Sequence, residues 1–398
     1  MKFILIGISD NRDQHFTPEV LGIIHQGQVF SGGKRHHELM AHHLPTQYQW
    51  IDITVPISGV IEQYQQVSAK GAIVVFASGD PLFFGFANTL RRLLPKAELQ
   101  VFPYFNSLQL LAHRMLLAYH DMHTISLTGR PWDALDKALI QGDKLIGSLT
   151  DQKKTPAQIA ERMLQYGYDN YTMTVGECLG NHQEEQVRNL TLEEAAHTEF
   201  RFPNCIILQQ TYAKPHPLGL PESEFNLLNG RVNMITKMPI RLLTLSLLDL
   251  QQRNTLWDVG SCTGSISIEA KLQFPHLNIT AFEIRPEGEE LLQSNSRKFG
   301  APGIQFHKGD FLETLQSGLL EGQHPDAVFI GGHGGQLKEM VQAISKVLAP
   351  GGCIVFNSVS ANSLNLFREG VEVAGMCIVQ QTRIAVDEHN PIEIIKAQ

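Results

Sequence analysis

A glycine-rich turn between a strand-like run and a helix-like run is the feature that most constrains this chain. Asp258-Val259-Gly260-Ser261-Cys262-Thr263-Gly264 closes an apolar run over 255–259, and a helical pattern follows over 264–274. In parallel sheets, ligands bind at the carboxyl ends of strands, where glycines admit the ligand and free helix N–H groups face it. The turn therefore predicts an α/β unit with a ligand site beside Asp258.

The rest of the C-terminal half repeats this alternation of strand and helix. We predict helices over 239–250, 264–274, 286–299 and 336–348, and strands over 255–259, 278–282, 304–307, 327–330, 353–357, 376–381 and 391–395. Seven strands joined by crossover helices, with a two-strand return at the end, predict a Rossmann-like sheet.

The residues at the strand ends favour S-adenosylmethionine (SAM) over a dinucleotide. A dinucleotide turn needs G-x-G-x-x-G, but Cys262 and Ser265 occupy the second and third glycine positions. SAM has no phosphate; it needs groups for its methionine end and an acid for its ribose. Asp258 can take the ammonium group, Glu283 can accept the ribose hydroxyls, and Asp310 would flank the adenine. The loop 329–335 would leave room for the methyl acceptor.

The N-terminal half is also α/β. The β-branched run 72–77 predicts a buried central strand, Thr17-Pro18 a helix start, and 124–126, 144–149, 171–175 and 205–209 the strands of a second subdomain. Three prolines and a glycine within 212–221 favour a linker. We thus predict one unit over 1–212, with subdomains at about 1–115 and 116–212, a linker over 213–222, and a second unit over 223–398.

Composition limits the class of protein. A chain of 398 residues fits two or three domains of roughly 100 to 200 residues each. The longest apolar runs are too short to span a membrane, and no secretory signal is recognisable, so we expect a cytoplasmic protein without a membrane partner. The net charge of −8 disfavours nucleic acid as a partner. We expect a homo-oligomer.

The cysteines and histidines offer little support for a metal site. The five cysteines are scattered without C-x-x-C spacing, which favours buried, reduced thiols over zinc or disulfides. His36, His37, His42 and His43 occur as adjacent pairs, which is not the spacing of ligands on one helix face. We expect no metal bound by the protein; cobalt, if present, would arrive inside the substrate.

The C-terminal half resembles the decarboxylating precorrin C15-methyltransferases of corrin biosynthesis. The residues that carry the resemblance are 219–225, Met234-Ile235-Thr236-Lys237 before a helix with Arg241, 256–260 with 264–270, the loop Gly331-Gly332-His333-Gly334-Gly335, and Asn390-Pro391-Ile392. The resemblance implies a class I Rossmann-like methyltransferase fold. By motif match it implies SAM contacts at Thr236, Asp258, Gly260, Ser261, Cys262, Thr263, Gly264, Glu283, Asp310, Phe311 and Gly331. The family usually has glycine at the position of Cys262.

The N-terminal half resembles the class III tetrapyrrole methyltransferases, most closely the precorrin C5-methyltransferases. Gly79-Asp80-Pro81 after the central strand is a weak signal alone, and the segments 32–39, 106–110, 127–131, 154–160 and 177–180 extend the match. The resemblance implies two α/β subdomains with SAM held between them largely by backbone groups. By position the contacts would be Gly79, Asp80, Pro81, Gly85, Ser107, Leu108 and Leu179.

Together the two resemblances imply a fused enzyme that binds two SAM molecules per chain and methylates a tetrapyrrole at C5 and C15 with loss of CO2. Such a substrate carries many carboxylates, so basic side chains should line the clefts. The candidates are Lys34, Arg35, Arg130, Lys237, Arg241 and Arg285, and the weak catalytic candidates are His333 and Arg241. Two alternatives stay open: methylation of RNA or protein, and a fusion in which one unit is inactive.

Overall fold

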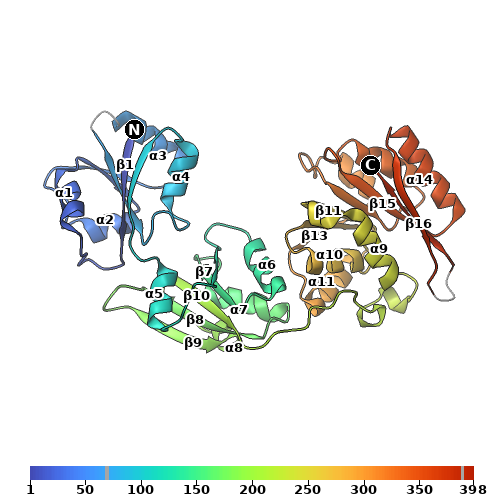
Figure 1. The fold of residues 1–398 in the computed structure, drawn as a ribbon, viewed down its shortest axis with the longest axis horizontal. Helices are drawn as coiled ribbons and strands as arrows, with labels where there is room; N and C mark the ends of the chain where they lie inside the picture. The colour runs from blue at the N-terminus through green and yellow to red at the C-terminus, as the bar shows by residue number, and fades with distance from the viewer. Residues whose placement is uncertain (68–70, 387–389) are drawn as a thin grey trace. The chain divides into compact units, whose positions relative to one another are not determined.

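The computed structural model describes residues 1–67, 71–386 and 390–398 (Figure 1). Contacts between Cα atoms divide the described chain into two units. The first comprises residues 1–131, 144–161 and 171–211, and the second 132–143, 162–170 and 212–398. The second unit resumes at Tyr212, the residue before the linker predicted over 213–222, but two short segments of the predicted first domain group with the second unit.

The first sheet of the N-terminal unit is fully parallel, with the order β3-β2-β4-β1-β5. Its strands are β1 (Lys2–Ile8), β2 (Val29–Gly32), β3 (Gln49–Asp52), β4 (Ile73–Ser78) and β5 (Glu98–Phe102). The helices of this region are α1 (Pro18–Gln26), α2 (Lys34–Met40), α3 (Ile57–Val67), α4 (Phe86–Leu93) and α5 (Ser107–Arg114). The predicted start of α1 is confirmed, since the Thr17 side chain caps it.

Helices cover both faces of this sheet. Phe3 and Leu5 of β1 pack with α3 and α4, whereas Ile4 and Ile6 pack with α1 and α2. Successive side chains of a strand point to opposite faces, so a strand covered on both sides is apolar at every position. This explains the continuous apolar runs, and it leaves the strand ends as the place for polar groups.

The second sheet of this unit is mixed, with the order β6-β7-β10-β8-β9. Its strands are β6 (His123–Ser126), β7 (Leu145–Leu149), β8 (Tyr171–Glu177), β9 (Gln186–Thr191) and β10 (Asn204–Gln210). The helices along this stretch of sequence are α6 (Asp133–Gln141), α7 (Pro156–Gln165) and α8 (Leu192–Ala196). The strand β9 was not predicted, because its outward-facing residues give it no buried apolar run.

The C-terminal unit holds the predicted Rossmann-like sheet, in the order β13-β12-β11-β14-β15-β17-β16. Its strands are β11 (Thr255–Val259), β12 (Asn278–Glu283), β13 (Ile304–Lys308), β14 (Ala327–Ile330), β15 (Cys353–Ser358), β16 (Ile378–Ile384) and β17 (Ile392–Ala397). The last two run antiparallel, as the predicted two-strand return requires. The helices from the linker onward are α9 (Met238–Leu248), α10 (Ser265–Gln273), α11 (Gly288–Phe299), α12 (Phe311–Gln316), α13 (Leu337–Ser345) and α14 (Ala361–Val373).

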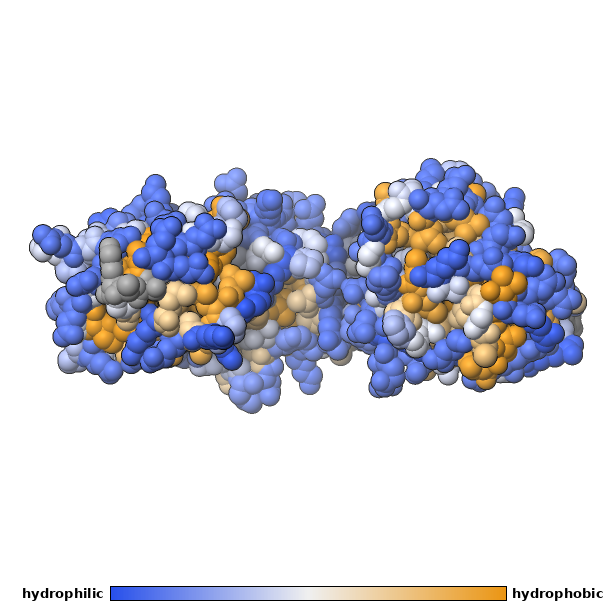
Figure 2. Space-filling view, turned by 90° about the horizontal axis from the view of Figure 1, so that it is seen from above, coloured by the Kyte–Doolittle hydropathy of each residue, from blue (hydrophilic) through white to orange (hydrophobic). Residues whose placement is uncertain are grey.

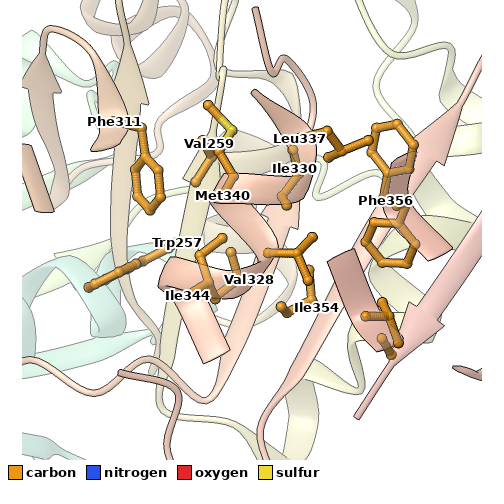
Figure 3. Packing of buried hydrophobic residues seen from close by; sticks show 14 of the residues in the cluster. Trp257, Val259, Phe311, Val328, Ile330, Leu337, Met340, Ile344, Ile354 and Phe356 are labelled. Atoms are coloured by element: carbon orange, nitrogen blue, oxygen red, sulfur yellow. The ribbon is translucent and has the colours of Figure 1, made fainter. Parts of the chain in front are cut away.

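A large apolar core fixes the strand ends of this sheet. Trp257 and Val259 of β11 pack with Phe311, Leu337 and Met340 on one face (Figure 3). Leu256, between them, packs with α9 and α10 on the other face. Because buried cores are close-packed, this packing holds the end of β11 in a defined position relative to β12 and β14.

On the face drawn in Figure 2, hydrophilic side chains cover most of both units, with apolar patches between them. Over the described residues, none of the helices combines the length and the apolar character needed to cross a bilayer. Cys178, Cys205 and Cys353 are buried free thiols, as expected, but Cys377 is exposed because it precedes the edge strand β16.

Candidate active sites

Asp258 lies at the end of β11 with only 1% of its surface exposed. Its Oδ2 accepts hydrogen bonds from the backbone N–H (3.2 Å) and the hydroxyl (2.6 Å) of Ser267 in α10. Its Oδ1 has no hydrogen-bond partner among the described residues, although the side chain lines a cavity of about 540 Å³. Burial raises the pKa of this carboxyl to about 6. An unpaired buried carboxylate oxygen beside a cavity is suited to a cationic ligand group.

The turn after Asp258 supplies further unpaired polar atoms. The hydroxyls of Ser261 and Thr263 are buried without a partner in the described part of the chain, and both residues line the same cavity. Cys262 has φ +49°, a left-handed conformation that glycine adopts more easily. Its Sγ–H donates to the carbonyl of Met234 at 3.3 Å. The side chain at 262 thus connects the turn to the segment that contains Thr236.

The loop between β14 and α13 packs directly on this turn. A Cβ at Gly260 would lie 2.4 Å from the backbone nitrogen of Gly332, so only glycine fits there. The N–H groups of Gly331 and Gly332 donate to the carbonyl of Val259 at 2.8 and 3.3 Å. The contact brings the two glycine-rich segments together at the carboxyl ends of β11 and β14. A Cβ at Gly331 would also be too close to its surroundings, at 2.9 Å from the ring of Phe329.

Glu283 at the end of β12 lines a second cavity of about 410 Å³, together with Asp310 and Phe311. Its Oε2 accepts the N–H of Cys262 at 2.9 Å. Its Oε1 accepts the backbone N–H of Arg285 at 3.0 Å and the guanidinium Nη1 at 3.1 Å. Gly260, Arg285 and Gly332 line both cavities, so the two are neighbours.

These two cavities bring together most of the residues predicted for the C-terminal site. Gly264 lines neither of them; its φ of +74° makes the turn into α10, and a Cβ there would lie 2.2 Å from Leu292. The sequence did not point to Asn233 and Asn357, which line the larger cavity. A lone asparagine gives no recognisable signal in a single sequence.

Arg241 does not reach either cavity and corrects our expectation of a substrate contact. Its side chain is fully buried and donates to Glu269 (3.2 Å), to the carbonyl of Thr236 (2.8 Å) and to the carbonyl of Leu220. Glu269, also fully buried, accepts the N–H groups of Gly219 and Leu220 at 2.9 and 2.8 Å. Arg241 therefore holds the end of the linker and the Thr236 segment in place.

Lys237 and His333 are half-buried, and each lines one of the two cavities. Lys237 lines the larger cavity, and its ammonium donates to the carbonyl of Val232 at 3.1 Å. His333 lines the smaller one, where its Nδ1 accepts the N–H of Gly335 at 3.1 Å. Partial burial lowers its pKa. With Nδ1 occupied as an acceptor, the neutral ring carries its proton on Nε2 and can donate it.

The N-terminal unit has its own cavity, of about 310 Å³, at the end of β4. Gly79 lines it with φ +62°, and a Cβ there would lie 2.8 Å from the Cα of Asn106. Ser107 and Leu179, two of the residues expected to contact SAM, line it as well.

Four residues predicted as SAM contacts in this unit do not line the cavity; they are Asp80, Pro81, Gly85 and Leu108. Asp80 accepts the N–H of Leu82 at 2.8 Å, and a Cβ at Gly85 would lie 2.3 Å from the Pro81 carbonyl oxygen. Leu108 is fully buried. These residues shape the turn and the core behind the cavity.

His36 connects α2 to the cavity through Ser78. Its Nδ1 accepts the N–H of Gly33 at 3.2 Å, so its Nε2 carries the proton and donates to Ser78 Oγ at 2.9 Å. Burial, with a smaller effect of Arg35, lowers the pKa of His36 to about 4, which keeps the ring neutral. Ser78 lines the cavity, and this bond leaves its own O–H free to donate to a ligand.

Of the three basic candidates in this unit, only Arg35 lines the cavity, where it pairs with Asp10. Lys34 and Arg130 are exposed outside it, and the Arg130 guanidinium lies 5.0 Å from the Phe84 ring centroid.

The paired histidines of this unit contact aromatic rings. His37 stacks on Trp50 with 4.0 Å between the ring centroids, and the tilted rings of His42 and His43 are also 4.0 Å apart. Within the described ranges, no three His, Cys, Asp or Glu residues form a group able to hold a metal.

Comparison with known proteins covers both units. The family model for the precorrin methyltransferase domain matches residues 230–397. The precorrin-6Y C(5,15)-methyltransferase (decarboxylating) of Sinorhizobium sp is 31% identical over 360 residues, which are 90% of this chain and 84% of that protein. The chain belongs to this family.

Two further relatives each match less than half of the chain. The cobalt-precorrin-6B C(15)-methyltransferase (decarboxylating) of Salmonella typhimurium is 33% identical over 165 residues, 42% of this chain and 83% of that protein. A crystal structure of the precorrin-6Y C5,15-methyltransferase from Geobacter metallireducens GS-15 covers 47% of this chain and 99% of its own, with 33% identity and a TM-score of 0.42. The sheets agree with the α/β fold class expected from the sequence: two five-stranded sheets in the N-terminal unit and a seven-stranded Rossmann-like sheet in the C-terminal unit.

Proposed function

We propose that this protein uses SAM to methylate C5 and C15 of a precorrin of the precorrin-6B or precorrin-7 type, or its cobalt form, and removes the ring C acetate carboxyl as CO2. The proposal rests on the presence of two units in a chain that matches a bifunctional relative. The chain aligns over 90% of its length with a C(5,15)-methyltransferase and has a cavity at strand ends in each unit. A single methylation would require only one of these units.

The C-terminal residues fit the polar ends of SAM. Asp258 Oδ1 would accept the ammonium group, and the unpaired hydroxyls of Ser261 and Thr263 would donate to the carboxylate. Glu283 would accept the ribose hydroxyls in the neighbouring cavity, beside Asp310. When bound, SAM supplies an electrophilic methyl group. The three unpaired atoms would then all be satisfied.

The residues around this site favour catalysis by positioning. A meso carbon flanked by reduced pyrroles is enamine-like and nucleophilic, so methyl transfer depends on alignment and exclusion of water more than on a strong base. Gly331 and Gly332 leave room for a flat macrocycle beside the turn, and Lys237 and Arg285 offer positive charge at the rim. His333, with its proton on Nε2, is suited to donate to a substrate carboxylate.

Loss of CO2 should depend on the C-terminal unit alone. We expect Glu283→Ala to reduce CO2 release from precorrin-6B by a hundredfold or more. The ribose of SAM would lose a charged acceptor, and the N–H of Cys262 would lose its hydrogen-bond partner. Gly79→Val, which blocks the N-terminal cavity, should leave CO2 release in place. Headspace mass spectrometry measures the product. Release at the normal rate by Glu283→Ala would contradict the assignment of decarboxylation to this site.

Two SAM sites per chain are part of the proposal. Calorimetric titration with S-adenosylhomocysteine (SAH), which cannot transfer a methyl group, should give two molecules bound per chain. Glu283→Ala and Gly79→Val should each remove one of them, because the cavities lie in separate units. A total of one in the unmodified protein would favour the alternative in which one unit is inactive.

A further inference from the structure

We propose that Arg285 binds a carboxylate of the macrocycle, and that its guanidinium becomes available for this contact only when the ribose of SAM binds to Glu283. The inference rests on the proposed function of the C-terminal unit. Two observations carry it: the occupancy of the Glu283 oxygens, and the position of Arg285 on both cavities.

The carboxylate of Glu283 has room for one more donor, not two. Each carboxylate oxygen offers two lone pairs. Oε1 already accepts two donors, both from Arg285, whereas Oε2 accepts only the N–H of Cys262. A ribose that donates one hydroxyl to each oxygen therefore needs one present donor to leave Oε1.

The guanidinium of Arg285 is the donor that can leave. Its backbone N–H is fixed by the loop after β12, but its side chain is 42% exposed and flexible. The carboxylate is held in place instead, because Glu283 is only 2% exposed and its Oε2 accepts the N–H of Cys262 at 2.9 Å. SAM binding thus exchanges an ion pair for a ribose contact at a buried acid.

The released guanidinium lies beside the cavity where the macrocycle would bind. Arg285 lines the larger cavity as well as the smaller, and Lys237 is a second cation there. A guanidinium matches a carboxylate with two parallel hydrogen bonds. Without SAM this fork is turned toward Glu283; with SAM it is free for an acetate or propionate side chain. Cofactor binding would therefore strengthen substrate binding, and by linkage substrate would strengthen cofactor binding equally.

The test compares Arg285→Ala with Lys237→Ala, a cation of the same cavity without a contact to Glu283. SAH binding is measured by calorimetry on the full chain without macrocycle, and the C-terminal site is the one lost in Glu283→Ala. Arg285→Ala should tighten SAH binding at this site by up to about fivefold, because the contact between the part-exposed guanidinium and Glu283 no longer has to be broken. Lys237→Ala breaks no contact to Glu283 and should therefore not tighten SAH binding.

The second measurement is the affinity for precorrin-6B with and without saturating SAH. In the unmodified protein SAH should raise this affinity by about tenfold or more, the contribution of a charge-assisted carboxylate pair. Arg285→Ala should remove this increase. Lys237→Ala should weaken the binding of precorrin-6B, but SAH should still increase it. Arg285→Lys, which keeps the charge but not the fork, should recover only part of it.

The outcomes separate the two proposals. If Glu283→Ala leaves SAH binding unaltered at both sites, the SAM site of the proposed function fails. If Glu283 is required but Arg285→Ala weakens SAH binding or leaves it unchanged, the role of Arg285 is refuted while the SAM site stands. Equal coupling in the unmodified protein and Arg285→Ala would refute it too.

Discussion

Replacing Asp258 with asparagine should stabilise the ligand-free C-terminal unit and weaken its binding of SAH by roughly tenfold to a hundredfold. The carboxyl is buried, and its folded-state pKa is raised from 3.8 to about 6. A group with a raised acid pKa favours folding when it is protonated, and this contribution is lost as the pH rises through 6. At pH 7.5 the ionised side chain therefore costs about 3 kcal/mol.

Scanning calorimetry at several pH values measures this effect. At pH 7.5 the melting temperature of the C-terminal unit should rise by roughly 5 °C or more in Asp258→Asn. The gain should shrink as the pH falls through 6, because the native carboxyl becomes protonated. Asp310→Asn, at another acid of the proposed SAM site, is a control for stability alone, since asparagine caps α12 as well as aspartate does. A lower melting temperature with unaltered SAH binding would contradict the ligand role of Asp258.

Arg241→Ala should have the opposite effect on stability. It leaves Glu269 charged in a fully buried position and removes the donors to the carbonyls of Thr236 and Leu220. Removing one partner of a buried ion pair costs about 3 to 5 kcal/mol. Urea unfolding followed by circular dichroism measures this loss. SAH binding should weaken as well, because Thr236 lines the ligand cavity.

A double variant tests whether the charge is the cause. Arg241→Met with Glu269→Gln removes both charges at similar volume and keeps one acceptor for the linker N–H groups. We expect it to recover at least half of the lost stability, since the uncompensated charge is gone. Arg231→Ala is the surface control and should change stability by less than about 0.5 kcal/mol. A double variant no more stable than Arg241→Ala would show that lost packing dominates.

The strands and their ends could be predicted because they are local signals. Apolar runs over β11, β12 and β14 are short, and the acids at 258 and 283 stand at the carboxyl ends of β11 and β12. The helix α14 was missed because Gly370 interrupts its pattern. That glycine is needed where α14 crosses α13, since a Cβ there would lie 3.1 Å from the Cβ of Val341.

The role of a basic residue was harder to predict than its presence. Arg241 follows the Thr236-Lys237 motif and was expected in the cleft, but its partner Glu269 lies 28 residues further along the chain. Only the packing of α9 against α10 brings them together. Charge pairing across elements is a tertiary property that one sequence does not reveal.

Mass spectrometry of the macrocycle is the most direct measurement of the double function. Precorrin-6B, with and without cobalt, is incubated with SAM and the full chain, and the product is compared with the substrate. We predict the gain of two methyl groups and the loss of CO2 in at least one of the two metallation states. An unchanged mass in both would contradict the proposal that this chain is a C5,C15-methyltransferase.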